Sequence, residues 1–132
     1  MALPSFIPQF LTGFRMPSGS NLQALSDMSG SVQTAVTAFA GGGQTNATLI
    51  NAANVQVDTV ATAADSIKLP PAVPGMRIFI VNNDAADSMQ VFGSGTDTIN
   101  GAAAATGVAQ AAGKSALYAC TTAGKWFRNL SA

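Results

Sequence analysis

The chain has no histidine and no glutamate, and it has a single cysteine among its 132 residues. Histidine is the side chain most often used for acid–base chemistry near neutral pH, and it is the commonest metal ligand. Cys120 has no partner for a disulfide within the chain and cannot form a thiolate metal cluster alone. These absences predict that the protein is not an enzyme and that it holds no metal or other cofactor.

Charged side chains are also scarce, because only 9% of the residues are charged and six Lys and Arg balance six Asp. Nucleic acid and anionic membranes are both bound through clustered cations, and the sequence has no such cluster. No run approaches the roughly 20 apolar residues of a membrane-spanning helix. We therefore expect no nucleic-acid partner and no membrane partner. A neutral, weakly charged surface instead favours association with other protein subunits.

The N-terminus combines apolar side chains with prolines. Pro4, Pro8 and Pro17 interrupt any continuous helix and favour extended backbone, so we expect an extended arm and not a signal peptide. Two interpretations of this arm stay open: it folds back on its own domain, or it docks on another subunit. The candidate contacts with a capsid or subunit are Phe6, Ile7, Phe10, Leu11 and Phe14.

Three consecutive glycines, Gly41–Gly43, predict a flexible joint between two regions. Residues 1–43 are then an N-terminal arm or anchor that includes this joint, and residues 44–132 form a β body. Within the first region, "SVQTAVTAFA" fits either a strand or a short helix.

Residues after the joint alternate between apolar and polar, which is the period of a half-buried strand. The strongest strand is "GMRIFIVNND", whose centre Ile78, Phe79, Ile80 and Val81 is apolar on both faces. Such a strand lies between two layers, or between its own core and a neighbouring subunit. Trp126 in the last strand is expected to close the core. These five residues are the candidate subunit interface or core.

Seven or eight short strands with regular turn signals predict an all-β fold, a small β-sandwich or jelly-roll-like barrel that carries the extended N-terminal arm. The alanine-rich "GAAAATGVAQAAG" opposes this pattern, since alanine is the best helix former. Glycines at positions 101, 107 and 113 interrupt it regularly, so a loop with an edge strand is preferred over a helix.

Gly113-Lys114-Ser115 is the one stretch that suggests nucleotide chemistry, because a phosphate-binding P-loop ends in this way. The motif needs a glycine five positions before Gly113, but that residue is Val108. The motif also needs a helix after the lysine, whereas "SALYACT" has the pattern of a strand. The sequence therefore predicts no nucleotide site.

Other candidate sites each have a simpler structural explanation. Asp84 and Asp87 could pair as catalytic carboxylates or bind Ca²⁺, but "NNDAAD" is typical of a turn. Cys120 is expected to be a buried structural thiol. Trp126 and Phe127 lie between Lys125 and Arg128 and could stack on bases or sugars. The preferred interpretation is that the aromatic ring is in the core and the charges face solvent.

Residues 66–129 resemble the C-terminal body of small structural proteins of tailed bacteriophages and prophages. The resemblance rests on strand and turn signatures distributed along this half of the chain: Leu69-Pro70, Pro74-Gly75, Ile78 to Asn82, Val91-Phe92, Asp97 to Gly101, Leu117 to Cys120, and Gly124 to Trp126.

The resemblance implies a virion component on the capsid surface, made in the host cytoplasm, that is a capsid decoration (cement) protein or a head fibre. It implies two partners, the major capsid protein and further copies of the chain itself, usually as a homotrimer. It names no catalytic residue. The alternative is a tail-fibre or host-attachment module that recognises glycans through Trp126, Tyr118 and the Asp-rich turns.

Overall fold

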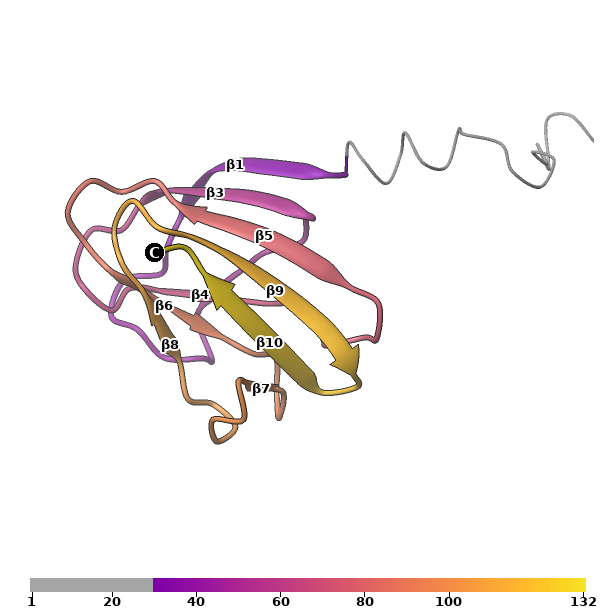
Figure 1. The fold of residues 1–132 in the computed structure, drawn as a ribbon. Coiled ribbons are helices and arrows are strands. Elements are labelled where there is room, and N and C mark those ends of the chain that lie inside the picture. Colours follow the sequence, from indigo (N-terminus) through magenta and orange to yellow (C-terminus); the bar gives the residue numbers. More distant parts are fainter. Residues whose placement is uncertain (1–29) are drawn as a thin grey trace, which may run out of the picture. The chain divides into compact units, whose positions relative to one another are not determined.

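The computed structural model of the protein describes residues 30–132, and this part contains ten β-strands and no helix (Figure 1). The all-β prediction is confirmed here, and "SVQTAVTAFA" contributes a strand. The strands are β1 (Val32–Thr37), β2 (Thr48–Leu49), β3 (Asn54–Thr59), β4 (Ser66–Lys68), β5 (Arg77–Asn82), β6 (Met89–Phe92), β7 (Thr98–Ile99), β8 (Val108–Gln110), β9 (Ser115–Thr122) and β10 (Lys125–Leu130).

The first six strands coil back and forth between two sheets. β1, β3 and β5 lie side by side in a six-stranded sheet, and β2, β4 and β6 lie side by side in a four-stranded sheet. Every neighbouring pair in these two sets is parallel. This stacking of successive coils is the arrangement of a β-solenoid.

The last four strands complete both sheets with a different connectivity. β8 pairs antiparallel with β6 and ends the four-stranded sheet, whose order is β2-β4-β6-β8. β9 pairs antiparallel with β5, and β10 returns beside β9 as a hairpin. β7 pairs in parallel with β10, so the six-stranded sheet has the order β1-β3-β5-β9-β10-β7 (Figure 1).

The prediction of a β-sandwich or jelly-roll-like barrel was therefore wrong, because the strands are connected and paired differently. Those folds are built from antiparallel strands, whereas the coil from β1 to β6 pairs in parallel. Alternation of apolar and polar residues is the same for a strand in either pairing, so the pattern alone does not separate them. The alanine-rich stretch does form a loop and an edge strand, β8, as predicted.

The hydrophobic core lies between the two sheets, where equivalent positions of successive coils stack. Val55 of β3 lies opposite Ile80 of β5, and Ile67 of β4 lies opposite Val91 of β6. All four side chains are at most 2% exposed. Burying a side chain of this size contributes roughly 1.5–3 kcal/mol, so these stacks stabilise the coil.

A buried polar network, which we call the Gln110 network, connects the two sheets through the core. The Gln110 amide nitrogen donates to the carbonyl oxygens of Ile80 and Lys114, both at 3.0 Å. The Tyr118 hydroxyl donates to the Gln110 side-chain oxygen at 3.0 Å. The Asn82 amide nitrogen donates to the Gln110 main-chain carbonyl, also at 3.0 Å. These bonds fix β8 of one sheet against β5 and β9 of the other.

The compact unit formed by the strands begins at Ser31. β1 therefore belongs to it, although the sequence division at residue 43 assigns this segment to the arm region. Gly41–Gly43 lie in the connection between β1 and β2, and all three have positive φ, between 70° and 92°. Glycine adopts this backbone conformation without strain, so the glycines shape a tight connection inside the unit.

The free edge of the six-stranded sheet is interrupted by a bulge in β1. The pairing of β1 with β3 shifts register between Gln33 and Val36, and Ala35 between them has a φ of 56°. The Ala35 amide donates to a carboxylate oxygen of Asp58 at 2.9 Å, which holds the bulge in place. A bulged edge is a poor template for pairing with a strand of another molecule.

Candidate functional site

β5 places its apolar side chains on two different surfaces. Ile78 and Ile80 are 2% and 0% exposed and face the core, whereas Phe79 between them is 40% exposed. The prediction that this strand is apolar on both faces is therefore confirmed, and the outer face is uncovered in the part of the chain that the structure describes. Whether another subunit covers it stays a prediction.

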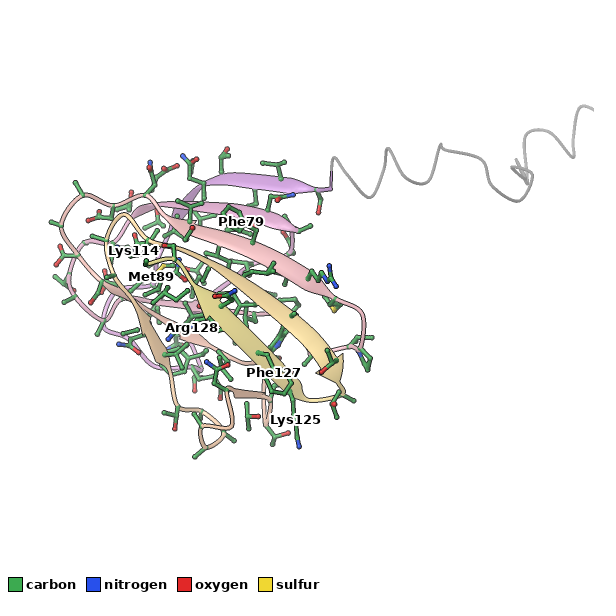
Figure 2. The ribbon with its side chains drawn as sticks, in the orientation of Figure 1. Phe79, Met89, Lys114, Lys125, Phe127 and Arg128 are labelled. Atoms are coloured by element: carbon green, nitrogen blue, oxygen red, sulfur yellow. The ribbon has the colours of Figure 1, made fainter. Side chains whose placement is uncertain are left out.

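Phe79, Leu117 and Phe127 form an apolar cluster on the outer side of the six-stranded sheet, which we call the open face. Phe79 of β5 lies directly opposite Leu117 of β9. Phe127 of β10 lies opposite Ala119, one step along the same side of β9. The three side chains are 40%, 39% and 49% exposed. Figure 2 labels Phe79 and Phe127 on their two strands.

The open face exposes apolar area from two aromatic rings and from the residues between them. A phenylalanine offers roughly 200 Å² of surface, so Phe79 and Phe127 together expose roughly 180 Å² at their observed fractions. Leu117 and Ala119 extend this area between them. The largest apolar patch on a typical monomer is roughly 300–600 Å² and is often functional.

Polar residues surround the open face and define its limits. Along the central row, Asn54 lies beside Phe79, and Asn129 lies beside Leu117. A depression of about 200 Å³ lies at one end of the cluster; its lining residues are Phe79, Ser115, Ala116, Leu117, Asn129, Leu130 and Ser131. An apolar centre with a polar rim is the composition of a protein–protein contact.

A second hollow of about 350 Å³, which we call the Arg77 groove, lies at the start of β5. Its lining residues are Ser31, Asn51, Ala52, Ala53, Pro70, Met76, Arg77 and Ile78. They come from four separate segments of the chain, which the parallel coil brings together.

Leu117, Phe127 and Arg77 were not predicted from sequence as interface residues, and Phe127 was considered only for stacking on bases or sugars. A usable signal was present for the first two, because each alternates with a fully buried neighbour, Tyr118 or Trp126. A strand that hides one apolar side chain and exposes the next has two apolar faces, as β5 does.

The interpretation of Trp126 as a core residue is confirmed. Trp126 and Tyr118 are both 0% exposed, so neither can stack on a sugar at the surface. The indole nitrogen of Trp126 is buried without a hydrogen-bond partner in residues 30–132. Lys125 is exposed, and Arg128 donates to the Ala109 carbonyl of β8 at 2.6 Å. The prediction that Trp126 and Tyr118 recognise a glycan is therefore wrong, because both side chains are buried.

Lys114 lies in the turn before β9, and its ammonium group donates to the main-chain oxygen of Ala132. Ser115 begins β9 directly, so the segment after the lysine is a strand, as predicted. Cys120 is buried in the same strand, as predicted, and its thiol lies 3.2 Å from the Thr122 carbonyl oxygen.

Asp84 has the turn role that the sequence indicates. Its carboxylate accepts main-chain N–H bonds from Asp87, Ala86 and Val60, and these bonds hold its pKa below the usual value. Within residues 30–132, no three acidic or cysteine side chains group as a metal site would require. The carboxylate therefore works as a turn cap.

The candidate contacts Phe6, Ile7, Phe10, Leu11 and Phe14 lie outside the residues that the structure describes. Among residues 30–132, no helix is long and apolar enough to cross a membrane. No protein-family model matches the chain, and neither a curated protein nor a solved structure matches it. The resemblance to phage structural proteins therefore stays a prediction.

Proposed function

We propose that the chain is a structural protein of a tailed-bacteriophage particle, either a capsid decoration (cement) protein or a head fibre. In this proposal, the N-terminal arm binds the major capsid protein at the capsid surface, and the β body associates with further copies of the chain as a homotrimer. Its role is adhesive, and it needs no catalytic residue and no cofactor.

The observation that carries the proposal is the open face. Phe79, Leu117 and Phe127 leave water-exposed apolar surface on a sheet that the Gln110 network and the core hold rigid. Removing apolar surface from water stabilises a contact by roughly 25 cal/mol per Å². Repetition of such contacts on a symmetric shell adds avidity. The strand and turn signatures in residues 66–129 support the same class of protein.

The location on a particle is tested by measuring copies of the chain per purified virion, by quantitative mass spectrometry against the major capsid protein. A copy number equal to that of the capsid protein, or a simple fraction set by shell symmetry, is the expected result. A handful of copies would place the chain on the tail and favour the alternative host-attachment function. Absence from the particle would contradict both.

Self-association is tested by replacing Phe79 and Phe127 with serine and measuring the mass of the full chain by light scattering. We expect the oligomer to dissociate to monomers, because both rings leave the centre of the contact. Phe39→Ser is the matched control, since Phe39 is also 40% exposed but lies outside the open face. An unchanged oligomer in the double variant would refute this contact.

Anchoring is tested by deleting residues 2–20 from the chain. The truncated protein is expected to remain a folded oligomer and to lose binding to capsids that lack the wild-type chain. If it still saturates those capsids, the arm is not the anchor.

A further inference from the structure

The Arg77 groove combines an apolar floor with one cation, Arg77, that forms no ion pair within residues 30–132. Ala52 and Ile78 are buried, and Met76 and Pro70 are partly exposed around them. Ser31, Asn51 and Arg77 supply the polar rim. The volume of about 350 Å³ is within the range of roughly 300–1,000 Å³ that is usual for ligand sites, and this mixture of a mostly apolar lining with a few polar groups is typical of them.

No carboxylate of residues 30–132 lines this groove, and no ion pair joins Arg77 to an acidic residue of that range. Two aspartates of the same range have hydrogen-bond partners elsewhere in the fold. Asp58 accepts from Gln56 and Asn83, and Asp97 accepts from the Ala72 amide. Within the part of the chain that the structure describes, the charge of Arg77 is therefore available to a partner.

The chemistry of a matching partner follows from these two features. A guanidinium group presents a planar set of N–H donors that fits a carboxylate in two parallel hydrogen bonds. The apolar floor beside it fits an aliphatic side chain. An acidic residue that follows directly after an aliphatic residue supplies both groups.

We propose that the Arg77 groove binds a peptide segment of a partner chain in which an aliphatic residue is followed by an acidic residue. The aliphatic side chain occupies the floor between Ala52, Met76 and Ile78, and the carboxylate pairs with Arg77. Arg77 lies opposite Ala119, so the groove adjoins the open face at the start of β5, but the proposal does not depend on the virion proposal.

The test is a nuclear magnetic resonance titration of the isotope-labelled full chain with a capped Ala-Leu-Asp-Ala peptide. Saturable shifts are expected for the amides of Ala52, Ala53 and the segment 76–78. A capped Ala-Leu-Asn-Ala peptide is expected to bind about two- to fivefold more weakly, because an ion pair with an exposed arginine is lost.

Protein variants complete the test. Arg77→Gln should weaken binding of the Asp peptide by about the same factor and leave that of the Asn peptide nearly unchanged. Arg77 is exposed, so the variant is expected to fold, and its spectrum verifies this directly. Lys125→Gln, which removes a charge on the same sheet outside the groove, should bind as the wild type does.

Three outcomes would overturn the proposal: no saturable shift among the groove amides, equal affinity for the two peptides, or no effect of Arg77→Gln. Shifts confined to the open face would also overturn it, since they would assign the peptide to the other surface.

Discussion

Replacing Gln110 with leucine removes the centre of the Gln110 network and changes the side-chain volume little. Three hydrogen bonds of the Gln110 side chain are lost, those with Ile80, Lys114 and Tyr118. The Lys114 carbonyl keeps a second hydrogen bond, which the main-chain N–H of Asn82 donates at 2.9 Å. The Tyr118 hydroxyl stays buried but loses its acceptor, the Gln110 side-chain oxygen.

The expected cost follows from these groups. Leaving a buried polar group unpaired costs about 1–3 kcal/mol. The Tyr118 hydroxyl carries most of this penalty, because Ile80 lies at a hydrogen-bonded position of the β5–β9 ladder and its carbonyl keeps that bond. We therefore expect Gln110→Leu to lower the free energy of unfolding by about 1–3 kcal/mol. A domain of this size has roughly 5–15 kcal/mol in total. The variant should therefore fold with a clearly reduced denaturant midpoint.

Urea unfolding followed by tryptophan fluorescence measures this effect, because Trp126 is the only tryptophan and is fully buried. Tyr118→Phe alone should cost about 1–2 kcal/mol, since it leaves only the Gln110 side-chain oxygen unpaired. In the Gln110→Leu/Tyr118→Phe double variant no tyrosine hydroxyl is left without an acceptor. The loss of unfolding free energy should therefore be smaller than the sum of the two single losses.

Two results would refute this reasoning. A Gln110→Leu protein within about 0.5 kcal/mol of wild type would show that the network does not stabilise the fold. Strict additivity in the double variant would show that Gln110 and Tyr118 act independently.

Two further predictions concern a glycine and the same tyrosine. Gly93→Ala should lower the free energy of unfolding in urea by about 1–3 kcal/mol, because the new Cβ would lie 2.6 Å from the Asp97 carbonyl oxygen. The control is Gly95→Ala, where space is open but φ is 54°, and its cost should be no more than about 1–2 kcal/mol. A larger cost for Gly95→Ala than for Gly93→Ala would contradict the clash. Burial raises the pKa of Tyr118, against an opposing effect of the Arg128 charge. The unfolded chain therefore releases this proton first as pH rises, so stability is complete below about pH 10 and falls above it. Tyr118 is the only tyrosine, so Tyr118→Phe should lose this alkaline decline, and an unchanged decline would exclude Tyr118 as its cause.

Much of the local structure could be predicted from sequence. The two apolar faces of β5, the burial of Trp126, the turn role of Asp84 and the edge strand in the alanine-rich segment all follow from period-two patterns and turn chemistry. These are local properties, and a few neighbouring residues determine each of them.

The parallel coil could not be predicted in the same way. Its repeat is visible in space, where Val55 lies opposite Ile80, but the intervening connections differ in length and composition. Only the inward positions recur, and alternation of apolar residues is common to every half-buried strand. Parallel pairing between distant segments therefore has no distinct signature in the sequence.

The candidate surfaces illustrate the same limit. Phe79 could be named because its own strand reveals it, whereas its neighbour Leu117 becomes relevant only through the pairing of β5 with β9. The Arg77 groove depends on residues from Ser31 to Ile78 that meet only after the coil forms. Sites assembled from several segments require the register, which sequence pattern does not supply.

The position of β9 beside β5 has a consequence for synthesis on the ribosome. Domains fold from the N-terminal side as the chain emerges, and the coil from β1 to β6 can assemble in this order. β5 then ends at Asn82 with one edge unpaired until β9, which begins at Ser115, has emerged. During that interval Phe79 lies beside an open, unprotected edge, which is a template for aggregation. Premature termination before or within β9 should therefore yield insoluble chains, so synthesis of β9 determines whether the whole body stays in solution.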